Sequence, residues 1–484
     1  MTAVRFDDLT PGAERAFALR GLTGTVEARR PADVPAAIEA VEEAAARGLW
    51  AAGFVAYEAA PGLNPDLRVR DPAPRFERDL PLVWFGTFER RDELDPLGAG
   101  PPDPKRSDPI WEPSVDRSRY DDAIQRIREL IAAGDVYQVN HTLRLRARLE
   151  EDPDELYRHL CLAQRGRYSA FLDLGRHLVL SASPELFLRI EGDRIAVRPM
   201  KGTAPRGRWA AEDRQVARDL LASSKDRAEN AMIVDLLRND LGRVARPGSV
   251  EVARLFELER YETVWQLTST IAARLRPRLR LLDVLRALFP SGSVTGAPKV
   301  AAMRVIAELE DSPRGVYTGA IGYVAPDHEP GPRACFSVAI RTVVVDAATG
   351  TAEYGVGGGI TYDSCPRREY DEVLAKARVL SARRPEFELV ETLGHDPDTG
   401  YADLDEHLER LAASAAYFGF RHDPSAVAEA LDRAARALVG PARVRLALAR
   451  SGEVRTDTGP MPPAPEAPLR VAIDPEPVDP ADVW

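Results

Sequence analysis

The sequence predicts an α+β protein of two or three domains, and three observations predict this class. The chain has 484 residues, which is too long for one ordinary domain. Hydrophobic residues make up 44% and charged residues 29%, as in globular proteins that bury large cores. Short apolar segments between Gly- and Pro-rich turns predict strands, and segments with helical spacing and capping residues predict the helices between them.

The N-terminal region, residues 1–114, is predicted to consist mainly of short strands. Two apolar runs, 50–58 and 82–86, have the composition of buried strands. The following segment, 95–113, is rich in Pro, Gly and Asp and has few side chains to bury. We therefore expect it to be an exposed linker within a larger domain.

The next region is predicted to contain the longest helices. Ser118 is expected to cap a helix that ends at Gly134, because glycine suits the C-terminal turn of a helix. A long helix is expected over 223–242, where a serine caps a stripe of apolar residues. The cap of this helix is Ser223 or Ser224. Both helices belong to a predicted domain over residues 115–384. Its other expected elements are helices at about 282–289 and 366–380 and strands at 135–143, 178–183, 186–190, 319–324, 335–345 and 352–356.

The composition changes near residues 383–385, where we place a domain boundary. The C-terminal region, residues 385–484, begins with a short strand at 387–392. Two Ala-rich helices are expected at about 403–418 and 424–438, before a Pro-rich tail. These elements predict a small α/β fragment.

Charge and cysteine content exclude several classes of protein. The formal net charge of −11 argues against broad binding to nucleic acid or to membrane surfaces. The three cysteines are isolated, which predicts a reducing compartment and no disulfide framework. The sequence has no apolar run of membrane-spanning length and no N-terminal signal pattern, so we expect a cytoplasmic protein.

One lysine stands out in the stretch 198–207, where Gly202 and Pro205 predict a turn that presents Lys201. The chain has only five lysines, although arginine is abundant. Arginine stays protonated, whereas lysine can become a nucleophile once its pKa is lowered. Taken alone, Lys201 is either such a nucleophile or a solvated turn residue.

Two predicted helices each present carboxylates three residues apart, which places each pair on one helix face. The pairs are Asp226 with Glu229, and Glu369 with Glu372. If the two faces meet, their oxygens suit Mg²⁺, which takes one or two carboxylates together with waters and substrate oxygens. The alternative is that each pair belongs to a solvated helix face.

Two further features suit an anionic ligand. The run Gly357–Gly359 follows a predicted strand and can bring consecutive backbone N–H groups close to an anion. Arg341 can form a bidentate pair with a carboxylate. Either feature is also common in proteins without such a ligand, as a turn or a surface ion pair.

Four longer motifs resemble the chorismate-utilising enzymes. They span 225–241, 289–299, 314–323 and 363–377, in that order along the chain. The resemblance is dense over residues 115–382 and looser before them. It implies a large two-layered β-sheet sandwich flanked by helices, with chorismate as the substrate and Mg²⁺ as the cofactor.

Two positions place the chain within this family. Where members that add water carry a lysine, this chain has Gln138, so the resemblance implies ammonia as the nucleophile. Lys201, Gly202 and Thr203 resemble the triplet of the aminodeoxychorismate synthase large subunit. Amination of chorismate at ring carbon 4 is therefore the expected reaction.

The resemblance also implies a role for each residue of the site. Lys201 is expected to attack ring carbon 2, Glu185 to protonate the leaving hydroxyl and Thr203 to orient the ring. Glu229 and Glu372 are expected to hold Mg²⁺, with Asp226 and Glu369 in its shell. The residues expected to bind the substrate are Arg341, Tyr323, Gly357, Gly358, Gly359, Gln138, Thr295 and Gly296.

One position departs from many family members, which have His where this chain has Gln266. Gln266 keeps a polar group but removes an acid–base group, and this fits retention of the pyruvyl group on the product. Two alternatives remain open. The first is anthranilate synthase, which aminates carbon 2 and releases pyruvate, and the second is a non-catalytic scaffold for a glutamine amidotransferase.

The resemblance also bears on partners. None of the cysteines lies in a Gly-x-Cys-x-Gly elbow, so a separate glutamine amidotransferase subunit is expected to supply ammonia. The segments 389–392 and 404–415 resemble part of aminodeoxychorismate lyase, a pyridoxal-phosphate enzyme. That chemistry needs a lysine, and none follows Lys376 in this sequence, so a packing role is expected for the C-terminal fragment.

Overall fold

The structure is a computed structural model that describes residues 4–70, 80–98, 109–150, 152–329, 331, 333–381 and 387–462. The chain forms two compact units. The first comprises residues 1–98, 103–204 and 220–383, and the second comprises 99–102, 205–219 and 384–484. The predicted domain boundary at 384/385 lies outside the described residues.

Among the described residues, the first unit contains one sheet of eighteen strands. Neighbouring strands run antiparallel, as β6 and β18 do from the pair Arg148–Thr351 to the pair Val139–Ile360. The strands are β1 (Val4–Asp8), β2 (Arg15–Ala28), β3 (Trp50–Val55), β4 (Val83–Leu94), β5 (Glu112–Pro113), β6 (Gln138–Arg148), β7 (Tyr168–Asp173), β8 (His177–Ser183), β9 (Leu186–Glu191), β10 (Arg194–Arg198), β11 (Met200–Pro205), β12 (Glu251–Arg260), β13 (Val264–Arg274), β14 (Gly296–Ala297), β15 (Ala320–Val324), β16 (Ala334–Val338), β17 (Thr342–Asp346) and β18 (Thr351–Ile360).

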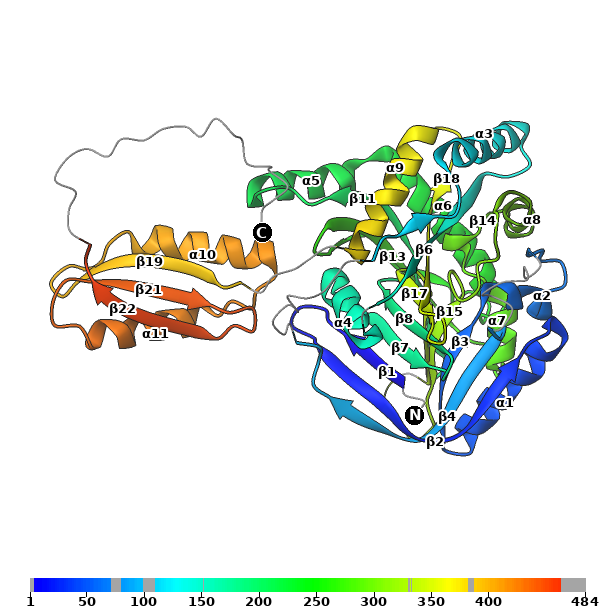
Figure 1. The fold of residues 1–484 in the computed structure, drawn as a ribbon, viewed down its shortest axis with the longest axis horizontal. Coiled ribbons are helices and arrows are strands. Elements are labelled where there is room, and N and C mark those ends of the chain that lie inside the picture. Colours follow the sequence, from blue (N-terminus) through cyan, green and yellow to red (C-terminus); the bar gives the residue numbers. More distant parts are fainter. Residues whose placement is uncertain are drawn as a thin grey trace. The chain divides into compact units, whose positions relative to one another are not determined.

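Helices cover the outer faces of this sheet (Figure 1). Helix α9 packs against both α3 and strand β18, and α6 packs against β13. The helices of this unit are α1 (Val34–Ala46), α2 (Ala60–Leu63), α3 (Arg117–Ala133), α4 (Pro153–Gln164), α6 (Ser224–Gly242), α7 (Leu281–Leu288), α8 (Lys299–Leu309) and α9 (Pro366–Ala377). Most of helix α5 (Ala210–Ala222) belongs to the second unit.

The sheet folds into two layers that face each other across an apolar core. Trp50 and Phe54 of β3 and Phe88 of β4 belong to one buried cluster with Val179 of β8 and Val344 of β17. Other apolar clusters lie under the flanking helices, one with α1, α6 and α7 and one with α3, α4 and α9. The predicted two-layered sandwich flanked by helices is confirmed.

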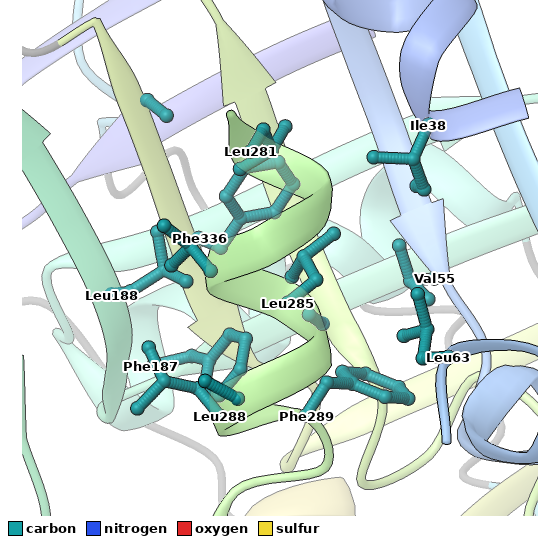
Figure 2. Close-up of a cluster of buried hydrophobic side chains, with 14 of the residues drawn as sticks. Ile38, Val55, Leu63, Phe187, Leu188, Leu281, Leu285, Leu288, Phe289 and Phe336 are labelled. Atoms are coloured by element: carbon teal, nitrogen blue, oxygen red, sulfur yellow. The ribbon is translucent and has the colours of Figure 1, made fainter. Parts of the chain in front are cut away.

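Helix α7 is the centre of the largest of these clusters (Figure 2). Leu285 is 0% exposed and points from α7 into the cluster, between side chains of strands β3, β9 and β16. Labelled neighbours from those strands are Val55, Phe187, Leu188 and Phe336, and Ile38 and Leu63 close the cluster from α1 and α2.

We expect Leu285→Ala to lower the free energy of unfolding by about 2–5 kcal/mol, because it leaves a cavity in a packed core. Urea denaturation followed by circular dichroism measures the change. The matched control is Ile110→Ala, since Ile110 is 83% exposed and should change stability by less than about 0.5 kcal/mol. Equal effects of the two substitutions would contradict the packing described here.

Local capping chemistry predicted some helix ends correctly. Ser223 is the N-cap of α6 and accepts a hydrogen bond from the Asp226 backbone N–H. Gly134 ends α3 with a φ of 83°. The predicted cap Ser118 is wrong, because Asp116 accepts the hydrogen bond from Arg119 and α3 begins earlier.

Two predicted elements differ in the structure. The single strand expected at 335–345 is two strands, β16 and β17, because Arg341 between them has a φ of 54° and interrupts extended backbone. The run Gly357–Gly359 lies within β18 and not after a strand. Nothing in a run of glycines distinguishes these two placements, since glycine also occurs where strands approach closely.

The second unit has a sheet of its own in the described residues, with the strand order β20, β19, β21, β22. Leu393, Leu411, Val427 and Val444 form its apolar core between the sheet and two helices. The elements are β19 (Leu389–Asp396), β20 (Gly400–Tyr401), α10 (Leu404–Phe418), α11 (Pro424–Arg436), β21 (Ala442–Leu448) and β22 (Val454–Pro460).

The segment Pro205–Asp219 also belongs to this second unit. Arg206 forms an ion pair with Asp213 at 2.7 Å and donates a hydrogen bond to the Tyr417 carbonyl at 2.9 Å. The Tyr417 hydroxyl in turn donates to the Gly207 carbonyl at 2.6 Å. The second unit is therefore assembled from segments that are far apart in the sequence.

None of the helices in the described ranges combines the length and the apolar character needed to cross a membrane.

Candidate active site

Lys201 lies in strand β11, so the predicted turn at this position is wrong. Gly202 has a φ of 95°, which an L side chain rarely adopts. A Cβ atom on Gly202 would lie 3.1 Å from the Asp226 Cβ and 3.2 Å from the Leu267 Cβ. Glycine here lets β11 approach helix α6 closely, which brings Lys201 to the carboxylates of that helix.

The two acidic helix faces lie within electrostatic reach of each other and of Lys201. Glu229 of α6 interacts with Lys201 and with Glu372 of α9. Glu372 forms an ion pair with Lys376, with 2.6 Å between Oε1 and Nζ. Burial raises the pKa of Glu229. Burial also acts to raise the pKa of Glu372, but Lys376, Lys201 and Lys225 together lower it below its ordinary value. The structure thus places Glu229 and Glu372, one residue from each predicted pair, within electrostatic reach of each other.

Strand β18 lies against the side chains of Lys201, Glu369 and Lys376, and its glycines leave room for them. A Cβ on Gly358 would lie 3.5 Å from the Lys376 Nζ and 3.6 Å from a Glu369 carboxylate oxygen. A Cβ on Gly359 would lie 2.2 Å from the Gln138 Nε2 and 2.5 Å from the Lys201 Nζ. No side chain fits at Gly359 unless Gln138 and Lys201 move.

Glu185 lies at the turn between β8 and β9, within electrostatic reach of Lys201. It is only 3% exposed, and its carboxyl oxygen accepts a hydrogen bond of 2.5 Å from the Ser293 hydroxyl. Burial raises the pKa of Glu185 to about 7, against the opposing effects of Ser293 and Lys201. A carboxyl group with this pKa can donate a proton near neutral pH.

The environment of Lys201 favours its neutral, nucleophilic form. Burial lowers the pKa of Lys201, and the Lys376 ammonium lowers it further. The carboxylates of Glu229, Glu185 and Glu372 act in the opposite direction but do not restore the ordinary value. A lysine with a lowered pKa that interacts with an acid of raised pKa is an arrangement that suits nucleophilic catalysis.

Other predicted residues lie around this centre. The Arg341 guanidinium donates a hydrogen bond to the Lys376 carbonyl, at the end of α9. Gln138 is 1% exposed, and its Oε1 has no hydrogen-bond partner among the described residues. The Thr203 hydroxyl donates to the Gln266 side-chain oxygen at 3.1 Å.

Thr295 and Gly296 make contacts with backbone atoms of their own loop and of strand β6. The Thr295 hydroxyl donates to the Ser291 carbonyl at 3.1 Å. Gly296 has a φ of 141°, and a Cβ there would lie 2.2 Å from the Gln138 carbonyl oxygen. This loop therefore supports β6 at Gln138 through backbone contacts.

The structure does not bring Tyr323 into this group. Its ring packs against Phe6, Phe17 and Trp50, with centroid distances of 5.3, 5.5 and 5.7 Å. Successive side chains of a strand point to opposite faces, so a position in the right strand can still face away from a site. Tyr323 belongs instead to an aromatic cluster between β1, β2, β3 and β15.

Two residues of the cluster were not identified from the sequence. Lys376 holds Glu372 and donates to the Gly357 carbonyl at 3.0 Å. Its spacing of four residues from Glu372 on one helix is a signal that could have identified it. Ser293 contacts Glu185 across 108 residues of sequence, and no local pattern indicates that contact.

The carboxylates of the two acidic helices are hard oxygen donors, the ligand type that Mg²⁺ takes. Among the described residues, no three His, Cys, Asp or Glu side chains gather closely enough to hold a metal ion alone. Mg²⁺ does not need such a cage, because it completes its shell with waters and substrate oxygens. Glu229 and Glu372 supply hard oxygen ligands. Each carboxylate has a cation beside it in the structure: the Lys225 Nζ lies 3.9 Å from the Glu229 Oε1, and the Lys376 Nζ lies 2.6 Å from the Glu372 Oε1.

The fold is that of the chorismate-utilising enzymes. Anthranilate synthase component I from Streptococcus pneumoniae superposes with a TM-score of 0.66 and 26% sequence identity, over 77% of this chain and 93% of that structure. Residues 12–382 match the family of chorismate binding enzymes. The chain belongs to that family.

Relatives with two different names share similar identity with the chain. Anthranilate synthase component 1 of Streptomyces coelicolor is 44% identical over 280 residues, which cover 57% of this chain and 53% of the relative. Aminodeoxychorismate synthase component 1 of Salmonella typhimurium is 44% identical over 278 residues, which cover 57% of this chain and 60% of the relative. The chain therefore aligns with little more than half the length of these relatives.

Proposed function

We propose that this protein aminates chorismate at ring carbon 4, as an aminodeoxychorismate synthase large subunit. The observation that carries the proposal is Lys201, whose lowered pKa and electrostatic contact with Glu185, Glu229 and Glu372 suit a nucleophile beside an anionic substrate.

The reaction starts with neutral Lys201. Its Nζ forms a bond to ring carbon 2, the ring double bonds shift, and the bond from carbon 4 to its hydroxyl breaks. Glu185 gives its proton to the departing hydroxyl, which leaves as water. Hydroxide is a poor leaving group, so this acid lowers the barrier substantially. The enzyme and the ring are then joined through Lys201.

Ammonia attacks carbon 4 in the second half of the reaction. The double bonds shift back, and the bond between carbon 2 and Lys201 breaks, which returns the amine to the enzyme. The proton lost by ammonia restores the proton that Glu185 gave. Chorismate and ammonia thus yield 4-amino-4-deoxychorismate and water, and the pyruvyl group stays on the product.

The substrate is held by charge at both carboxylates. Mg²⁺, when bound by Glu229 and Glu372, supplies positive charge for the ring carboxylate. Arg341 and the backbone of β18 at Gly358 suit the pyruvyl carboxylate. The buried Oε1 of Gln138 has no hydrogen-bond partner among the residues that the structure describes, and it can accept a hydrogen bond from ammonia.

The main alternative is amination at carbon 2 with loss of pyruvate, which the relatives named anthranilate synthase favour. Incubation with chorismate, ammonium and Mg²⁺ separates the two reactions. We expect chorismate to be consumed without anthranilate fluorescence, and p-aminobenzoate to form only after a lyase is added. Fluorescence without the lyase supports the alternative, and no consumption of chorismate supports a scaffold role.

We also propose that a separate glutamine amidotransferase supplies the ammonia. The supporting observation is that the similar relatives carry the designation component 1 in their names. Glutamine should not replace ammonium in the assay with this protein alone.

A further inference from the structure

We infer that Asn230 is a positioning residue that ties the strand of Lys201 to the helix of Glu229. This inference rests on the proposed function for its catalytic meaning, although the contacts themselves do not. Asn230 lies in α6 directly after Glu229 and is 1% exposed.

The amide of Asn230 uses its hydrogen-bonding capacity on both sides. Its Nδ2 donates to the Lys201 carbonyl at 3.1 Å and to the Leu267 carbonyl at 3.3 Å. Its Oδ1 accepts a hydrogen bond of 2.6 Å from the Ser269 hydroxyl. A single buried side chain therefore connects α6 to β11 and to β13.

The neighbours fix which way this amide points. Carbonyl oxygens only accept hydrogen bonds, so the NH₂ group must face Lys201 and Leu267. The Ser269 oxygen accepts from the Phe256 backbone N–H at 3.1 Å, which directs its own proton to the Asn230 Oδ1. The orientation of Asn230 is thus determined from both ends.

The position of the Lys201 amine depends on this anchor. Lysine has a flexible four-carbon stem, so its amine can be placed accurately only if its backbone is fixed. Asn230 fixes the Lys201 backbone to the helix that carries Glu229. The position of the Lys201 backbone relative to Glu229 is therefore held constant. Since Leu267 follows Gln266, the same amide also fixes the strand whose Gln266 contacts Thr203.

Asn230→Asp tests this role with little change in volume, because it replaces the NH₂ donor by an acceptor that faces two carbonyls. We expect kcat to fall by about tenfold to a hundredfold, the effect of a displacement on the order of 1 Å, while KM for chorismate changes much less. Ser269→Ala should change kcat in the same direction by a smaller factor. Asn239→Ala is the matched control, since Asn239 is exposed on the same helix and should change neither.

A second measurement does not depend on turnover. Reductive methylation with formaldehyde, resolved by mass spectrometry, gives the labelling rate of Lys201 relative to Lys225 in each variant. We expect this ratio to change at least severalfold in Asn230→Asp and less in Ser269→Ala. If Asn230→Asp does not fold, Ser269→Ala alone decides the question.

The outcomes separate the two proposals. Folded variants with the wild-type kcat and the wild-type labelling ratio would overturn the role of Asn230. A wild-type protein that never aminates chorismate would instead overturn the proposed function, while the labelling ratios still test the anchor.

Discussion

Lys201→Ala should lower the rate of 4-amino-4-deoxychorismate formation by about 10⁴-fold or more, as expected when a covalent nucleophile is removed. The wild-type protein, mixed with chorismate and Mg²⁺ without ammonia, should gain the mass of the dehydrated substrate on the peptide that contains Lys201. The variant should gain none. Any amination that remains is expected at carbon 2, which Lys201 no longer occupies.

Lys201→Arg is the control for charge. Arginine keeps the positive charge beside Glu229 and Glu372 but does not lose its proton, so it should be as inactive as alanine. High activity in this variant would mean that position 201 acts through charge alone. Unchanged product and rate in Lys201→Ala would refute the covalent route.

Glu185→Gln should have the second largest effect, a fall in kcat of about 10²- to 10⁴-fold, because glutamine cannot donate the proton that the leaving hydroxyl needs. Glutamine retains the volume of the side chain and can still contact Ser293. Rapid-quench measurement of adduct formation at Lys201 should locate the defect in the first half of the reaction. Normal adduct formation in this variant would assign the acid to another group.

The pH dependence gives an independent test of the same residue. Glu185 must be protonated to act and has a pKa of about 7, so kcat/KM should fall as the pH rises through about 7. Lys201 must be neutral to act, so kcat/KM should also fall as the pH decreases below its lowered pKa. Glu185→Gln should remove the alkaline limb and keep the acidic limb. An unchanged alkaline limb would contradict the assignment.

The parts of the fold that local chemistry specifies could be predicted from the sequence. The Ser223 cap of α6 and the Gly134 end of α3 depend on neighbouring residues only. The strand that holds Lys201 could not be predicted, because Gly202 and Pro205 indicate a turn when read locally. Pairing of β11 with β13, which comes much later in the chain, decides its conformation.

In the candidate site, too, features set by local sequence could be predicted, and features set by long-range packing could not. Helical spacing predicted that Asp226 and Glu229 share one face, as Glu369 and Glu372 do, but the approach of α6 to α9 depends on the whole sheet. The placement of Tyr323 could not be predicted from its strand, because a shift of one residue reverses the face on which a side chain lies.

The composite origin of the second unit limits how the protein can be divided. The segment Pro205–Asp219 follows Lys201 closely in the sequence but belongs to the same compact unit as the C-terminal region. Arg206, which forms an ion pair with Asp213, donates a hydrogen bond to the Tyr417 carbonyl. A gene fusion or deletion made at codon 384 would therefore separate an inserted segment from the partners it folds with. Recombination that exchanges this module intact must carry three separate stretches of coding sequence at once.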